Sequence, residues 1–227
     1  MSIRFSKKVM QEGAKTLQNY VKKNNKLPST LTLKDMEGKT RTLTKAQYSG
    51  LFDNQAQFFK KHSRLPNYTT LLYEADTAFV GEYQPTGTSC GPTSLANCAT
   101  QLFVYVTEKS CEQACKTNAN GTTPANLIAG AKKLGLKVTQ IPRTLNGVQK
   151  AFNEGKSVIA HIQTGGNTKP TCLGFLNNYG HYISIYKIKN GNFVVFDPTK
   201  GTKTCVPTQI IKATNGRTIH FYSVENL

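Results

Sequence analysis

The stretch that decides the fold is QPTGTSCGPTSLANCATQLF, residues 84–103. Cys90 follows a Gly-Thr-Ser turn and begins a predicted helix, so it would lie at the positive end of the helix dipole, which favours the nucleophilic thiolate. Gly and Ser flank Cys90 where a structural cysteine would have apolar neighbours, and we interpret it as a nucleophile. The predicted inward face of the helix, with Cys98 as a small apolar residue, consists of Leu95, Cys98, Leu102 and Phe103.

A glutamine upstream of the helix completes the first half of a candidate site. Gln84 lies six residues before Cys90. Attack by a thiolate on a carbonyl produces a negatively charged oxygen, which needs aimed hydrogen-bond donors. The side-chain amide of Gln84 and the backbone N–H of Cys90 are therefore the predicted oxyanion hole.

A histidine and an aspartate supply the second half. His181 begins a predicted strand, and Asp197 ends the next one. A nucleophilic thiolate needs an acid that protonates the leaving group, and a third group that orients that acid. Downstream of Glu154 the only carboxylates are Asp197 and Glu225, so by elimination Asp197 orients His181.

The turn between these two strands provides a geometric test. A two-residue turn at 190–191 would place His181 and Asp197 on opposite faces of the hairpin. A three-residue loop at 189–191, with a bulge, would pair Ile183 with Asp197 and bring His181 to the same face. The catalytic interpretation thus predicts the three-residue loop, unless a second bulge restores the register.

Other histidines and cysteines do not predict a metal site. His161 lies in a strand with no paired carboxylate strand after it, and we interpret it as a strand histidine near the core or the site. No CxxC pair and no HxxEH or HxxxH spacing is present, so neither a metal nor another cofactor is expected. A divalent-cation requirement stays open, and so does the disulfide state of the five cysteines other than Cys90.

The front of the chain contains a repeat. Residues 20–33 (YVKKNNKLPSTLTL) match residues 58–71 (FFKKHSRLPNYTTL) at an offset of 38. Each copy reads as a basic amphipathic helix, a Leu-Pro stop and a short extended piece. Duplication of a basic segment favours ligand binding over a purely structural helical subdomain. The predicted substrate-binding residues are Tyr20, Leu27, Pro28, Phe58, Leu65, Pro66 and Tyr68.

These patterns predict two domains joined at 73–80. Residues 1–76 would form a small helical domain with repeats at about 5–35 and 44–72, and residues 77–227 the catalytic domain. In the latter, helix signals come early and strand signals late, which favours an α+β fold. The predicted helices are 90–106, 110–117, 123–134 and 146–153, and the predicted strands are 137–141, 157–163, 181–188, 192–197 and 218–224.

Charge and hydropathy limit the partners and the location. The chain has 29 Lys and Arg against 12 Asp and Glu, a net charge of +17, which attracts polyanions such as nucleic acids, acidic lipids or wall polymers. No apolar run has transmembrane length, and the N-terminus shows no signal peptide. We therefore expect a protein that is made in the cytoplasm. We also expect it to be a monomer.

Taken together, the residues resemble those of a known family. The order Gln84, Cys90, His181, Asp197, with Cys-Gly-Pro opening a helix, resembles papain-like cysteine peptidases, above all the bacteriocin-processing type. The repeat, with Leu-Pro-Asn-Tyr-Thr at 65–69, looks like the pseudomurein-binding repeat; the first copy departs from it. The pairing is similar to the pseudomurein endoisopeptidases of methanogenic archaea and their viruses.

This resemblance implies hydrolysis of the Ala-ε-Lys isopeptide cross-link of pseudomurein by a papain-like fold. The implied partner is the pseudomurein wall, reached after release from the cell, rather than nucleic acid or a membrane. Three alternatives stay open: a peptidase that processes protein or peptide leaders, a catalytically inactive wall-binding module, and a transglutaminase-like protein, which also has Cys, His and Asp in this order.

Overall fold

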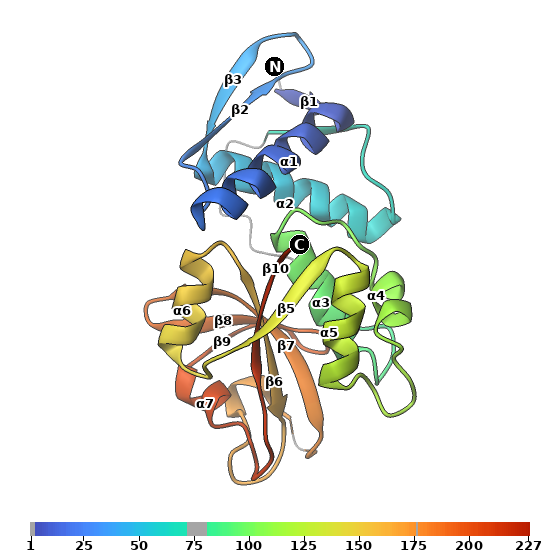
Figure 1. The fold of residues 1–227 in the computed structure, drawn as a ribbon, viewed down its shortest axis with the longest axis vertical. Helices are drawn as coiled ribbons and strands as arrows, with labels where there is room; N and C mark the ends of the chain where they lie inside the picture. The colour runs from blue at the N-terminus through green and yellow to red at the C-terminus, as the bar shows by residue number, and fades with distance from the viewer. Residues whose placement is uncertain (1–2, 72–80, 176) are drawn as a thin grey trace. The chain divides into compact units, whose positions relative to one another are not determined.

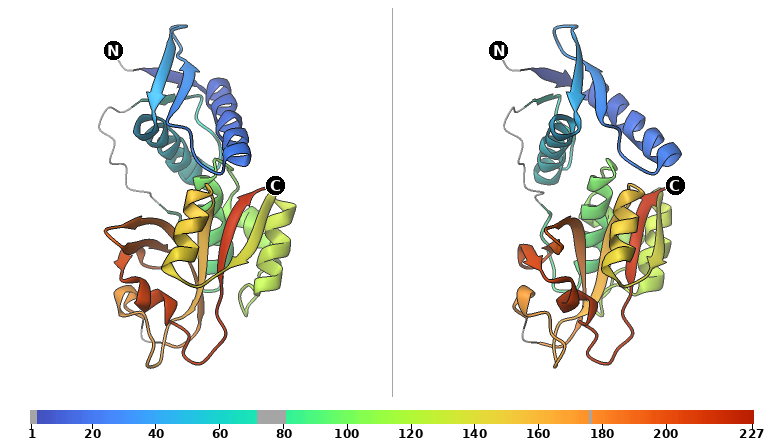
Figure 2. Two further views of the ribbon diagram at one scale, coloured as in Figure 1. Left: turned by 60° about the vertical axis from the view of Figure 1, so that its left-hand side comes forward. Right: turned by 90° about the vertical axis from the view of Figure 1, so that its left-hand side faces the viewer.

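The computed structural model describes residues 3–71, 81–175 and 177–227 (Figures 1 and 2). The chain divides into two compact units, Met1–Val80 and Gly81–Leu227. The predicted joint at 73–80 lies outside the described residues.

The N-terminal unit is built from two helices of 18 residues each, α1 (Lys7–Asn24) and α2 (Lys45–His62). A short strand precedes and follows each helix. These strands are β1 (Arg4–Ser6), β2 (Thr30–Lys34), β3 (Thr40–Thr44) and β4 (Tyr68–Thr70).

Both helices begin and end in the same way. The hydroxyls of Ser6 and Thr44 each accept a hydrogen bond, 3.4 Å long, from a backbone N–H three residues on, which satisfies a donor of the first turn. After the helices, Asn25 and Ser63 both adopt the left-handed conformation, with φ of 52°. The first helix and the second, 38 residues later, thus have equivalent N-terminal caps and equivalent left-handed residues at their C-terminal ends.

The two halves are joined by exchanged strand pairs. β1 of the first half pairs with β4 of the second, and β2 pairs with β3, both antiparallel. Ser6 lies opposite Tyr68, and Thr44 opposite Thr30, which are corresponding positions of the repeat. The sequence repeat is therefore also a structural repeat, in which equivalent residues of the two copies make equivalent strand pairs.

The strands correct the prediction of a small helical repeat domain. The Leu-Pro signal predicted a short extended piece after each helix, but β1 and β3 were missed. Strands of three to five residues are stable only when paired, and their partners come from the other half of the unit. The unit is therefore mixed α and β.

The second unit is an α+β domain with a six-stranded sheet, in which every neighbouring pair is antiparallel and the order is β5-β10-β6-β7-β8-β9. The strands are β5 (Leu136–Ile141), β6 (Ser157–Gln163), β7 (Gly180–Lys189), β8 (Asn192–Asp197), β9 (Gly201–Cys205) and β10 (Phe221–Asn226). The helices are α3 (Cys90–Gln101), α4 (Glu108–Ala114), α5 (Pro124–Lys133), α6 (Leu145–Asn153), the 3-10 turn η1 (Thr171–Leu173) and α7 (Pro207–Ile211).

Helices cover both faces of this sheet (Figure 1). Residues of α3, α4 and α5 share one apolar cluster with alternate strand residues such as Ile159 and Tyr182. Residues of α6, η1 and α7 share the second with Val158 and Ile183. Neighbouring residues of one strand, Val158 and Ile159 in β6 and Tyr182 and Ile183 in β7, therefore belong to different cores, because successive side chains of a strand point to opposite faces of the sheet.

The β7–β8 hairpin differs from the predicted three-residue turn. Lys189 pairs with Asn192, so the turn has two residues, Asn190 and Gly191, both with positive φ. A bulge between Ile185 and Lys187 then shifts the register by one residue, and Ser184 pairs with Phe196. The turn prediction was wrong, but the second bulge restores the register that His181 and Asp197 need.

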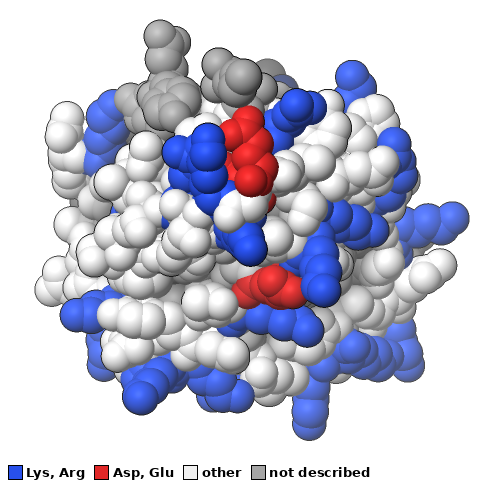
Figure 3. All heavy atoms as spheres, turned by 90° about the horizontal axis from the view of Figure 1, so that it is seen from above, with Lys and Arg blue, Asp and Glu red and all other residues white. Residues whose placement is uncertain are grey.

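The surface is strongly basic. On the face that Figure 3 shows, Lys and Arg side chains predominate over Asp and Glu. In the N-terminal unit both helices have basic residues in their last turn: Lys22, Lys23, Lys60, Lys61 and His62. Within the described ranges no helix is long and apolar enough to cross a bilayer.

Candidate active site

Cys90 is the first residue of the central helix. Every residue of α3 from Cys90 to Thr100 is buried, and the hydroxyls of Ser184 and Ser157 bind the helix through the carbonyls of Ser94 and Cys98, both at 3.2 Å. The N-cap residue Ser89 makes no side-chain cap. The first N–H groups of the helix are therefore not occupied by a side-chain cap, and that of Gly91 binds the Cys90 thiol.

His181 and Asp197 meet across the hairpin. Nε2 of His181 lies 3.0 Å from Oδ1 of Asp197, and the two residues are buried, with 1 % and 0 % of their surface exposed. Since Nε2 is engaged with the carboxylate, Nδ1 is the ring nitrogen that remains for the hydrogen bond between His181 and the Cys90 thiol. The structure thus brings together the three predicted catalytic residues.

The environment favours a thiolate beside an imidazolium. Burial opposes ionisation of Cys90, but the hydrogen bond and charge of His181, with backbone N–H groups of Tyr182 and Gly91, lower the pKa of the thiol. Burial likewise disfavours charge on His181, yet Asp197 and Cys90 raise its pKa to about 9. Between these two pKa values the pair is ionised, which is the reactive state of a thiol nucleophile.

Asp197 is itself fixed by the turn that follows it. Burial would raise its pKa, but His181 and Thr199 outweigh burial and lower it. The backbone N–H and the hydroxyl of Thr199 both donate to Oδ1 of Asp197, each at 2.8 Å. Sequence reasoning missed Thr199, although the spacing Asp-Pro-Thr is typical of such a local side-chain turn.

Gln84 is held beside the end of β8. Its backbone N–H donates to the carbonyl of Pro198 at 3.0 Å, next to Asp197. Two residues earlier, the side chain of Asn97 on α3 binds both the N–H and the carbonyl of Glu82. The segment is therefore tied to the elements that supply Asp197 and Cys90.

The side chain of Gln84 makes a local hydrogen bond. Its Nε2 donates to the carbonyl of Thr86 at 2.6 Å, four residues before Cys90. An amide nitrogen carries two hydrogens, so this bond leaves one donor for another acceptor. That remaining N–H is the group that the predicted oxyanion role requires.

Two aromatic rings beside His181 were also missed from the sequence. The ring centroids of Phe175 and Tyr179 lie 5.0 and 6.1 Å from that of His181. Burial and the charges of Asp197 and Cys90 raise the pKa of Tyr179. Both residues precede β7 in a loop without secondary structure, where pattern gives no indication of tertiary contacts.

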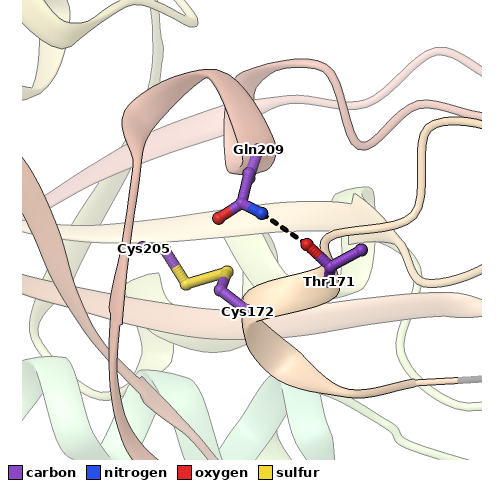
Figure 4. The surroundings of a disulfide bond; sticks show 4 residues. All are labelled: Thr171, Cys172, Cys205 and Gln209. Atoms are coloured by element: carbon purple, nitrogen blue, oxygen red, sulfur yellow. Dashed lines mark hydrogen bonds between the residues drawn. A yellow bond between two sulfur atoms is a disulfide. The ribbon is translucent and has the colours of Figure 1, made fainter.

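A disulfide holds the start of this loop (Figure 4). Cys172 in η1 is bonded to Cys205 at the end of β9, and Thr171 accepts a hydrogen bond from Gln209 of α7. The disulfide answers part of what the sequence left open. The other four cysteines, Cys90, Cys98, Cys111 and Cys115, are buried and form no disulfide.

His161 is not part of the catalytic group. Its ring stacks on Tyr182 with centroids 4.4 Å apart. Burial and the neighbouring histidines His220 and His181 lower its pKa to about 4, so it is neutral at physiological pH. The structure therefore agrees with its interpretation as a strand histidine near the site.

The predicted wall-binding residues differ in exposure. Pro28 and Pro66 are buried, and the carbonyl of Pro28 accepts a hydrogen bond from the Tyr48 hydroxyl at 2.7 Å. Leu27, Leu65 and Phe58 are half-buried. Tyr20 and Tyr68 are the most exposed of the set, at 36 % and 47 %.

Across the described part of the chain, no group of three His, Cys, Asp or Glu residues could hold a metal ion.

Comparison with known proteins gives the family. Residues 79–221 match the Peptidase C39 family. The chain belongs to the peptidase C39 family. It is a cysteine peptidase with the papain-like fold of that family, as the order of its cysteine, histidine and aspartate indicated.

The solved structures that match this chain are distant in sequence. The peptidase domain of Streptococcus ComA, a bi-functional ABC transporter of a quorum-sensing pathway, is 19% identical, with a TM-score of 0.50 over 66% of this chain and 100% of that chain. A double glycine motif protease from an AMS/PCAT transporter, in complex with its leader peptide, is 17% identical, with a TM-score of 0.47 over 62% and 88%. No curated protein matches.

Proposed function

We propose that this peptidase uses Cys90, His181 and Asp197 as its catalytic triad and hydrolyses the Ala-ε-Lys isopeptide cross-link of archaeal pseudomurein. The observation that supports the proposal most is the contact that runs from the Cys90 thiol through His181 to the buried carboxylate of Asp197. The duplicated basic unit supports a wall polymer as substrate. We expect it to act as a monomer, on the wall, after release from the cytoplasm.

The reaction follows from the groups present. The Cys90 thiolate attacks the alanine carbonyl, and the oxyanion is bound by the N–H of Cys90 and the free N–H of Gln84. His181 protonates the departing lysine amine, which is otherwise a poor leaving group because its ordinary pKa is about 10.4. Water, deprotonated by His181, then cleaves the thioester and regenerates the thiolate.

The test uses isolated pseudomurein walls. The wild-type protein should lower wall turbidity and release lysine ε-amines, and Cys90→Ala should abolish both while still sedimenting with the walls. Cys98→Ala, a change of the same chemistry at a buried cysteine of the same helix, should keep lysis. Lysis by Cys90→Ala would refute the nucleophile. Cleavage of leader peptides without release of ε-amines would instead favour the leader-processing alternative.

Wall binding can be tested on the same inactive protein. Lys22→Gln with Lys23→Gln should weaken sedimentation of Cys90→Ala, and rising salt should weaken it further, because the attraction is electrostatic. The matched control is Lys132→Gln with Lys133→Gln, which removes the same charge from the last turn of α5. Equal weakening by both pairs would mean that net charge, and not the repeat, drives binding.

A further inference from the structure

A pocket lies beside the His181–Asp197 pair. Its volume is about 300 Å³. One wall comes from the loop between η1 and β7, and the other from the turn after β8. The lining residues are Gly174, Phe175, Asn177, Tyr179, Thr199 and Lys200.

Three of these residues also touch the catalytic pair. Phe175 and Tyr179 pack edge-on against the imidazole of His181. Thr199 donates two hydrogen bonds to Asp197. The pocket therefore shares three of its lining residues with the immediate surroundings of His181 and Asp197, on the imidazole side of the reaction centre.

The chemistry of the reaction assigns this side to the leaving group. The imidazolium of His181 gives its proton to the amine as the carbon–nitrogen bond breaks, so that amine departs on the imidazole side of the sulfur. The acyl portion stays bonded to Cys90. Whatever extends from the amine thus reaches toward the pocket.

The lining combines an apolar surface with one positive charge. The rings of Phe175 and Tyr179 can pack against an aliphatic stem. The ammonium of Lys200 lies 5.8 Å from the centroid of the Phe175 ring, a cation–π distance that holds it at the pocket wall. In the ranges that the structure describes, no carboxylate lies within ion-pairing distance of Lys200, so its charge is open to a ligand.

From these contacts we infer that the pocket is a leaving-group subsite for an amine that carries an aliphatic stem and a carboxylate, with Lys200 as the specificity-determining residue. The inference rests on the proposed roles of Cys90 and His181, but not on pseudomurein as the substrate. A lysine whose ε-amine is released and whose α-carboxylate is free has this chemistry.

Acyl transfer tests the subsite without the natural substrate. N-acetylalanine p-nitrophenyl ester acylates Cys90 and releases nitrophenol. An added amine then attacks the thioester carbonyl, the carbon–sulfur bond breaks, the thiolate is regenerated and His181 takes the amine proton. Nα-acetyl-lysine and Nα-acetyl-lysinamide offer the same ε-amine and differ only in the carboxylate. The ratio of amide product to N-acetylalanine measures how well each amine binds, after subtraction of the Cys90→Ala background.

The wild-type enzyme should prefer Nα-acetyl-lysine by about two- to five-fold, as expected for one exposed ion pair. Lys200→Gln should remove the preference, Lys200→Glu should reverse it, and Lys189→Gln, an exposed lysine at the end of β7, should retain it. Equal partition in the wild type, or a preference that survives Lys200→Gln, would overturn the subsite. Absence of Cys90-dependent nitrophenol release would overturn the catalytic proposal and the subsite with it. A preference without wall lysis would refute only pseudomurein as substrate.

Discussion

The two units of the chain reach stability by different routes. The N-terminal unit makes each of its stabilising contacts twice. Ser6 and Thr44 cap its two helices, and its two β pairs join equivalent residues of the repeat. The peptidase unit depends on contacts made once, such as that between His181 and Asp197, which lie 16 residues apart and meet because of one bulge. The difference teaches that a group lost from one half of the duplicated unit leaves its equivalent in the other half, whereas the catalytic site has no second copy to replace a lost group.

The largest expected effect is at Asp197. Asp197→Asn should lower kcat on a short soluble Ala-ε-Lys isopeptide by about 10³- to 10⁴-fold, as loss of the orienting carboxylate does in other triads. The mutant should still fold and keep its wall binding. Glu225→Gln, at the other carboxylate downstream of Glu154, should leave kcat within a factor of two. A small effect at Asp197 would remove it from the triad.

Loss of the disulfide should destabilise only one unit. Cys172→Ser with Cys205→Ser opens a loop of 33 residues, which should cost about 2–4 kcal/mol of unfolding free energy. The N-terminal unit contains no cysteine and serves as an internal control. Calorimetry should show one transition shifted down and the other unchanged. A reductant should shift the wild-type transition and leave the double mutant unchanged. A wild-type transition that the reductant does not shift would mean that the bond does not form.

The pH profile should have an alkaline limit near the pKa of His181. That pKa is raised to about 9, so the imidazolium is present below it and is lost as pH rises, and activity should decline about tenfold per pH unit beyond it. The acid limit lies where the lowered pKa of Cys90 is passed and the thiolate is protonated. Because Asp197 raises the pKa of His181, Asp197→Asn should move the alkaline limit to lower pH. An unchanged limit would indicate that another group sets it.

The smallest effect sharpens the comparison within the repeat. Thr44→Ala and Ser6→Ala should each destabilise the N-terminal unit by about 1 kcal/mol, with Thr44→Ala the more costly. The reason is that the Thr44 hydroxyl also donates a 3.1 Å hydrogen bond to Oε1 of Gln47, within a capping box that Ser6 lacks. Urea unfolding of the N-terminal transition measures both. Thr123→Ala, at the cap of α5, should affect only the peptidase transition.

The sequence predicted the parts of this protein whose signals are local. The helix of Cys90, the extent of β6 and β8 and the Leu-Pro stops follow from periodicity, caps and turns, which act over a few residues. The choice of His181 over His161 also followed from the sequence, because only His181 is succeeded by a strand with a carboxylate.

Other features were decided by contacts between distant segments. The sequence could not give the bulge at residue 186, because its place depends on how β7 pairs with β6 as well as with β8. The same holds for β1 and β3, which need strands from the other half of the repeat, and for the disulfide between Cys172 and Cys205. The pocket at Lys200 is the clearest case: its residues come from two loops, and only the folded sheet brings them to one side of the histidine.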